Sequence, residues 1–136
     1  MATIKSYTDL EQSRQLAVFL PVETADLCYI AHSELINIYE PFYKKADKED
    51  IPCWSLASLL AILPNEILTD NRFECHYQIH IRKYDGDNKT TLYQIAYGNN
   101  RGLSGSWHDM INTGEKESLI DACYDMIIEL KEMNFL

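Results

Sequence analysis

The sequence predicts an α+β fold, with a single domain in which an antiparallel sheet carries helices on one face. Apolar and polar residues alternate from Phe73 to Arg82, which is typical of a half-buried strand. Towards both ends of the chain, apolar residues recur instead at helical spacing. A chain of 136 residues, 46% of them apolar, is long enough to bury a core without disulfide or metal cross-links. We therefore expect one domain over residues 1–136.

The chain before residue 50 is expected to form a helix, a hairpin and a charged linker. Thr8 and Glu11 have the spacing of a capping box, which predicts a helix over residues 9–20. Aromatic and branched residues over 25–31 and 35–43 predict the hairpin.

Residues 50–136 are expected to form an α-β-β-β-α core. Asp50 precedes an apolar segment that ends at Leu63 and tolerates Pro52 in its first turn, which predicts a buried helix. Three strands follow, over about residues 73–82, 91–97 and 105–111. A last helix is expected over about residues 118–133.

The loop between the first two of these strands sets their register. Because the apolar side chains of both strands must face the same side, the loop is expected to contain an odd number of residues. A three- or five-residue loop with a glycine bulge meets this condition. It places Ile79 opposite Tyr93 and Tyr77 opposite Ile95.

The charge balance favours protein partners. The chain holds 12 basic and 21 acidic side chains, so its formal net charge is −9, and the acidic excess lies in residues 1–50 and 115–136. Phosphate backbones and anionic lipids repel such a chain, so no nucleic acid and no membrane partner is expected. No apolar segment approaches the length of a transmembrane helix or a signal-peptide core, and we expect a cytoplasmic protein. Its partner is then a protein, basic or neutral.

No residue pattern predicts catalysis, a metal site or a cofactor. His76 and His80 suggest a metal site, yet four residues of strand span about 13 Å, too far for one ion to bind both. Together with Gln78 and Arg82, they predict a polar sheet face that is open to solvent or to a partner. An enzyme that uses this face is a further hypothesis, and it requires a cleft there.

The last helix carries more apolar surface than one sheet requires. Outside its core stripe lies a patch with flanking carboxylates, which consists of Ile120, Tyr124, Ile128, Asp121 and Asp125. Two interpretations stay open. The N-terminal segment covers the patch, or the patch binds a partner protein or a second copy of the chain. The leading functional hypothesis is a non-catalytic protein that acts through protein–protein contacts.

The acidic side of the same helix supports an alternative function. Four carboxylates recur every four residues, about 6 Å apart, which is comparable to the spacing of phosphates along a nucleic-acid strand. They are Glu117, Asp121, Asp125 and Glu129. This spacing suits an acidic inhibitor, which is an immunity protein, an antitoxin or a nucleic-acid mimic. Such an inhibitor occupies the basic site of a toxin, nuclease or defence protein.

Two segments resemble a known family. Residues 50–64 (DIPCWSLASLLAILP) and 120–133 (IDACYDMIIELKEM) look like recurring segments of small acidic proteins from prophages and mobile elements of gut bacteria. That family has no assigned activity, so the resemblance implies an accessory role in a mobile element and transfers no site. The α-β-β-β-α order is also similar to double-stranded-RNA-binding domains. Their last helix begins with a lysine cluster, whereas residues 117–121 here include two acidic residues and no lysine, which argues against RNA binding.

Overall fold

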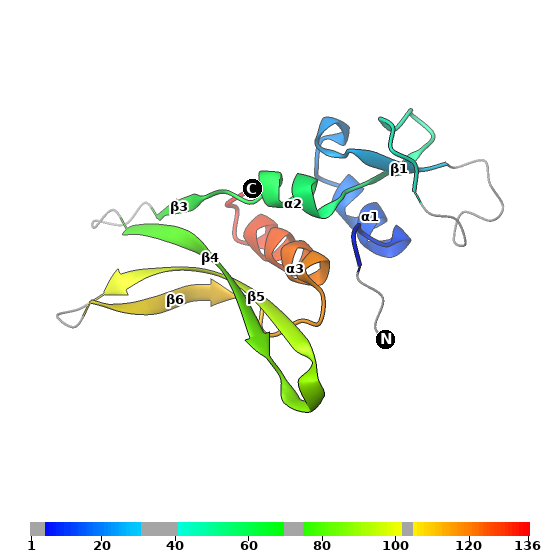
Figure 1. The fold of residues 1–136 in the computed structure, drawn as a ribbon. Coiled ribbons are helices and arrows are strands. Elements are labelled where there is room, and N and C mark those ends of the chain that lie inside the picture. The colour runs from blue at the N-terminus through cyan, green and yellow to red at the C-terminus, as the bar shows by residue number, and fades with distance from the viewer. Residues whose placement is uncertain (1–4, 31–40, 70–74, 102–104) are drawn as a thin grey trace. The chain divides into compact units, whose positions relative to one another are not determined.

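The protein is an α+β protein, as the sequence predicts. The computed structural model describes residues 5–30, 41–69, 75–101 and 105–136. Within these residues it contains three α-helices, a two-stranded antiparallel sheet and a four-stranded antiparallel sheet (Figure 1). The chain forms two compact units, Met1–Ile62 and Leu63–Leu136. The sequence predicts that the second part of the fold begins at residue 50, but the first unit extends to Ile62. Residues 50–62, which include one strand and one helix, therefore belong to the first unit.

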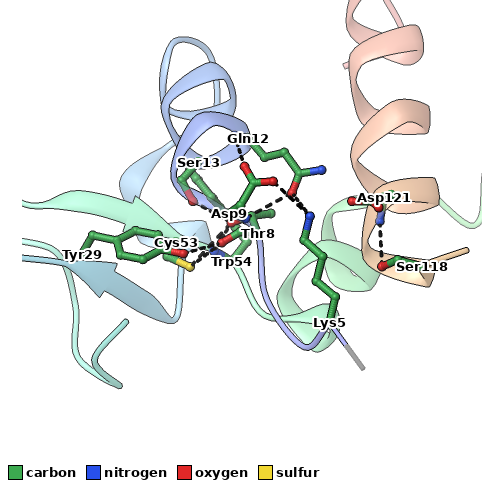
Figure 2. Close-up of polar contacts among 10 residues, drawn as sticks. All are labelled: Lys5, Thr8, Asp9, Gln12, Ser13, Tyr29, Cys53, Trp54, Ser118 and Asp121. Carbon is green, nitrogen blue, oxygen red and sulfur yellow. Dashed lines mark hydrogen bonds and ion pairs between the residues drawn. The ribbon is translucent and has the colours of Figure 1, made fainter. Parts of the chain in front are cut away.

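The first unit begins with helix α1, Leu10–Ala17, which is shorter than the predicted 9–20 and has a different cap. Asp9 is the N-cap, and it forms the capping box with Gln12 rather than Thr8 with Glu11. Thr8 is unavailable as a cap because it is fully buried and its hydroxyl group accepts a hydrogen bond from the Trp54 amide at 3.1 Å. Figure 2 shows this polar cluster around Thr8.

The small sheet pairs strand β1, Leu27–Tyr29, with strand β2, Ile51–Cys53. Of the hairpin predicted for 25–31 with 35–43, residues 31–40 lie outside the described residues. Phe42 exchanges two backbone hydrogen bonds of 2.9 Å with Cys28, so a strand-like contact joins the two segments.

The sequence predicts a helix that begins near Pro52, and this predicted start is wrong. Residues 51–53 form a strand, and helix α2 is confined to Leu56–Ile62. The reason is pairing with a distant segment, because the Thr8 amide donates to the Trp54 carbonyl at 2.9 Å and the Leu56 amide donates to Ser6 at 3.2 Å. These bonds hold Trp54 and Ser55 against the segment before α1, where Ser55 forms a bridge with Tyr7, and the helix begins only at Leu56.

The second unit contains one strand more than expected. Its sheet has the order β3-β4-β5-β6, and every neighbouring pair is antiparallel. The strands are β3 (Glu66–Thr69), β4 (Cys75–Asp85), β5 (Thr91–Arg101) and β6 (Ser106–Asn112). Strand β3 has four residues, and its adjacent Ile67 and Leu68 break the alternation of apolar and polar residues that would have indicated a strand. The fourth strand also departs from the three-stranded order of double-stranded-RNA-binding domains.

The register of β4 and β5 agrees with the odd loop but differs in its pairs. Five residues, 86–90, separate the paired ends Asp85 and Thr91. Ile79 faces Tyr97 and not Tyr93, and Ile95 faces Ile81 and not Tyr77, because the loop is centred on Asn88 and not on Gly86, two residues further along the chain. The left-handed residues of the loop are Asn88 and Lys89, both at φ 60°, so the predicted glycine bulge is wrong.

Helix α3, Leu119–Glu132, confirms the helix predicted for 118–133. The Ser118 hydroxyl group accepts from the Asp121 amide at 3.4 Å and caps it (Figure 2). The helix packs on β5, whose Ile95 and Tyr97 are fully buried. The Tyr97 hydroxyl group donates to the Pro64 carbonyl at 2.6 Å, which ties the segment before β3 to the core. The opposite sheet face carries the even-numbered residues of β4, including His80 and Arg82.

Candidate functional site

A groove lies between the end of β6 and helix α3. Its volume is about 320 Å³. Two of its lining residues end or follow β6 and the other five come from three successive turns of α3: Asn112, Thr113, Tyr124, Asp125, Ile128, Glu129 and Glu132. We refer to these seven residues as the α3 groove.

The groove brings together three of the five residues predicted on the last helix. Tyr124 and Ile128 are half-buried and line it, and Asp125 lies with them. Ile120 is fully buried and Asp121 is half-buried, and neither lines the groove. The accessible apolar part of the predicted patch is therefore Tyr124 and Ile128, one helical turn apart.

The β6 side of the groove is held by hydrogen bonds to β5. The Thr113 amide donates to the Ile95 carbonyl at 3.0 Å, and the Thr113 hydroxyl group accepts from the Ile95 amide at 3.1 Å. The Asn112 side-chain oxygen accepts from the Gly114 amide at 3.0 Å. Sequence analysis missed Asn112 and Thr113 because nothing in a strand end indicates which helix it will face.

The groove is negatively charged, and one internal cation reaches it. Lys116 Nζ lies 2.8 Å from Asp125 Oδ2. Backbone bonds with Tyr93, at 2.6 and 2.8 Å, fix the position of Lys116. Both partners of this ion pair are more than a third exposed, so it contributes only about 0–1 kcal/mol to stability. For Glu129 and Glu132, both exposed, the described part of the chain shows no ion pair.

The open face of the sheet carries the second set of predicted residues. His76, Gln78 and His80 are exposed and Arg82 is half-buried, all on the same side of β4. They do not converge on one point. His76 Nδ1 bonds to the Glu66 carboxylate of β3, whereas His80 stacks on Trp107 of β6 with ring centres 3.5 Å apart.

Arg82 is fully engaged with an acidic neighbour. Its guanidinium group binds both carboxylate oxygens of Asp109, at 2.6 and 2.8 Å, and the Trp107 indole nitrogen donates to the same carboxylate at 2.7 Å. The hydrogen bonds from Arg82 lower the pKa of Asp109 to about 2. They also raise the pKa of Arg82. Arg82, Trp107 and Asp109 satisfy one another's hydrogen bonds, which is more typical of a structural surface layer than of a catalytic centre.

Gly98 allows this layer to lie close to the sheet. A Cβ atom at Gly98 would lie 2.2 Å from the His108 carbonyl oxygen and 2.9 Å from the Trp107 ring. The indole therefore covers β5 at a position that no other residue can occupy without displacing the neighbouring backbone.

The thiols and possible metal ligands show no reactive arrangement in the described residues. Cys28, Cys53 and Cys123 are buried and unpaired with one another, and burial raises the pKa of each thiol, that of Cys123 to about 12. Thiols with raised pKa values are poor nucleophiles at neutral pH. Over the same residues, no group of three or more histidine, cysteine or acidic side chains is placed to hold a metal ion. No helix in the described ranges is long and apolar enough to cross a membrane.

Fold and site together define an α+β protein with an acidic, partly apolar groove at the edge of its larger sheet. Comparisons with protein-family models, with curated proteins and with solved structures found no match to this chain.

Proposed function

We propose that the chain is a non-catalytic binding protein that holds a partner protein in the α3 groove. The observation that carries this proposal is the position of Tyr124 and Ile128, which line an open groove next to carboxylates instead of filling the core. A tyrosine and an aliphatic residue with a charged rim are typical of the centre of a protein interface. The accessory role in a mobile element belongs to this proposal and is supported by the sequence resemblance.

The charge of the groove selects the partner. Asp125, Glu129 and Glu132 contribute three carboxylates, and Lys116 offsets only one of them. The whole chain carries a formal charge of −9, which attracts a basic partner from a distance. We therefore expect a partner with a basic surface.

A single substitution in the groove tests the proposal. In Tyr124→Glu, we expect the loss of the aromatic contact to outweigh the attraction between the added carboxylate and a basic ligand, so the partner is lost. Tyr43→Glu is the matched control, since Tyr43 is 85% exposed and lies in the first unit. The measurement is quantitative affinity capture with chemical cross-linking, and circular dichroism confirms that both variants are folded. Equal capture of the same basic proteins by folded Tyr124→Glu and by the control would refute the proposal.

The acidic inhibitor remains a second candidate because three of its four carboxylates, Asp121, Asp125 and Glu129, lie on α3, whereas Glu117 precedes the N-cap Ser118. The structure weakens its charge pattern, since Lys116 pairs with Asp125 in the middle of the series. An inhibitor of this kind requires the charges and not Tyr124. Its binding should therefore collapse between about 50 and 500 mM salt and in the double variant Asp121→Lys, Asp125→Lys. If binding survives high salt and the double variant but is lost in Tyr124→Glu, the partner binds in the α3 groove and the inhibitor hypothesis is excluded.

A further inference from the structure

We propose that the partner's bound segment is an extended basic peptide that adds a strand to the outer edge of β6 and places an arginine or lysine side chain in the α3 groove. This inference rests on the proposed function and specifies its ligand. It follows from where the groove lies, from the edge strand beside it and from the charges that line it.

Strand β6 is an edge strand beside the groove. It is last in the order β3-β4-β5-β6, and within the described residues no strand pairs with its outer side (Figure 1). Natural edge strands are commonly protected from pairing by lysine or proline. The β6 residues, Ser106–Asn112, contain neither. The strand carries a bulge opposite Tyr97 and Gly98, and bulges at sheet edges often lie next to binding sites.

The backbone of Asn112 points to the position that an added strand would occupy. The Thr113 amide donates to Ile95, so it faces β5. Amide groups alternate along a strand, and the N–H and C=O groups of Asn112 therefore point away from β5. Asn112 is also one of the residues that line the groove, while its side-chain nitrogen donates to Asp109 at 3.4 Å on the open sheet face. A peptide that bonds to the backbone amide of Asn112 places every second side chain on the face that α3 covers, which is how edge strands beside a helix select peptides.

The lining of the groove selects a long basic side chain. Tyr124 and Ile128 offer an aromatic ring and an aliphatic wall to a methylene stem, and Glu129 and Glu132 offer carboxylates to its charged end. The ion pair of Lys116 with Asp125, at 2.8 Å, shows that an ammonium group fits against this rim.

A second copy of the chain fits less well. Two copies that pair edge to edge each carry a formal charge of −9, and the residues Ser106–Asn112 contain no lysine or arginine to occupy the groove of either copy. Like charges that approach in this way oppose association.

The test uses three synthetic peptides on the full chain. The probe is acetyl-Thr-Val-Arg-Val-Arg-Val-Thr-amide. The second peptide carries glutamate in place of both arginines, and the third is the probe methylated on alternate backbone nitrogens so that it cannot pair. Titration of the 15N-labelled protein, followed by amide chemical shifts, gives the affinity and the residues affected. We expect shifts on β6 and α3 with the arginine peptide, and affinities at least about tenfold lower for the other two.

Two variants at one position separate the backbone from the side chain. Asn112→Pro removes the outward amide donor and leaves the bonds of Thr113 to β5 in place, so we expect about a tenfold loss of affinity. Asn112→Ala removes the same side chain but keeps the donor, so it is the reference for Asn112→Pro, which should bind about tenfold more weakly than Asn112→Ala. If Asn112→Pro does not fold, the methylated peptide on the wild-type chain answers the same question.

The outcomes distinguish this inference from the proposed function. If the arginine peptide binds and Tyr124→Glu abolishes binding, but Asn112→Pro and backbone methylation change nothing, then the groove binds its partner without strand addition and this inference is overturned. Equal binding of the arginine and glutamate peptides, shifts confined to other surfaces, or no shifts at all also overturn it. Light scattering that shows a dimer disrupted by Asn112→Pro would assign the edge to a second copy instead.

Discussion

Substitution of isoleucine by alanine at two positions of α3 distinguishes a residue of the core from a residue of the groove. Ile120 is fully buried, and truncation of such an isoleucine to alanine costs about 2–5 kcal/mol of unfolding free energy. Ile128 is half-buried and already lines an open groove. Its truncation therefore removes less apolar contact than truncation of Ile120, and it creates no enclosed cavity. We expect Ile128→Ala to cost about 1 kcal/mol.

The comparison is controlled because both changes lie within one helix. The gain in helix propensity from isoleucine to alanine is below about 0.7 kcal/mol at either site, which is smaller than the expected difference. Urea unfolding followed by circular dichroism measures each cost. With a slope of about 1.5 kcal/mol per molar urea, a difference of about 2 kcal/mol separates the midpoints by more than about 1 M.

Two results would refute the reasoning. If Ile128→Ala costs as much as Ile120→Ala, Ile128 belongs to the core and the groove cannot accept a ligand side chain. If both variants cost about 1 kcal/mol or less, Ile120 is not packed as the structure describes, and the whole predicted patch becomes accessible.

Three further predictions address the sheet face and the buried thiols. Arg82 lowers the folded-state pKa of Asp109 from 3.8 to about 2, so the stability it provides is present above about pH 4 and is lost as the pH falls towards 2. After allowance for solvent screening this amounts to about 1 kcal/mol, and acid titration of stability in Asp109→Asn should lack it. Gly98→Ala should cost about 2–3 kcal/mol in urea unfolding, because its Cβ meets backbone. Gly114→Ala should cost only about 1 kcal/mol, since it meets no atom within 4 Å and suffers only from its φ of 71°. Cys123 should react with iodoacetamide far more slowly in the folded chain than in urea, as measured by mass spectrometry, and equal rates would contradict its burial.

Sequence reasoning succeeded where local signals agree with one another. Helix α3 has a serine cap, an apolar stripe and no helix-breaking residue over 14 residues, and its bounds match the prediction closely. The alternation along β4 predicted a strand and placed His76, His80 and Arg82 on one face, as observed. Both are long elements, in which local preference and packing favour the same structure.

Sequence reasoning failed where a distant segment of the chain determines the local structure. Nothing near Pro52 shows that residues 54–56 pair with the backbone before α1, and nothing near Thr8 shows that its hydroxyl group is occupied by Trp54. The predicted capping box and the predicted helix start were therefore both wrong for one reason. A contact across more than 40 residues of chain supplied hydrogen bonds that the local pattern could not reveal.

The candidate site was also predicted only in part, since local signals identify its helix residues but not its strand residues. The helical pattern identified Tyr124 and Ile128 as surplus to the core, but it could not identify the strand end that forms the other wall. Helix α3 packs on β5, and β6 is the last strand of the sheet. A helix with a wider apolar surface than the strands beneath it leaves side chains beyond the sheet edge, and these line the groove with Asn112 and Thr113. An added strand at that edge would extend the sheet beneath those side chains. The surplus apolar surface and the exposed edge of β6 therefore have one common explanation, because a single extended ligand can cover both.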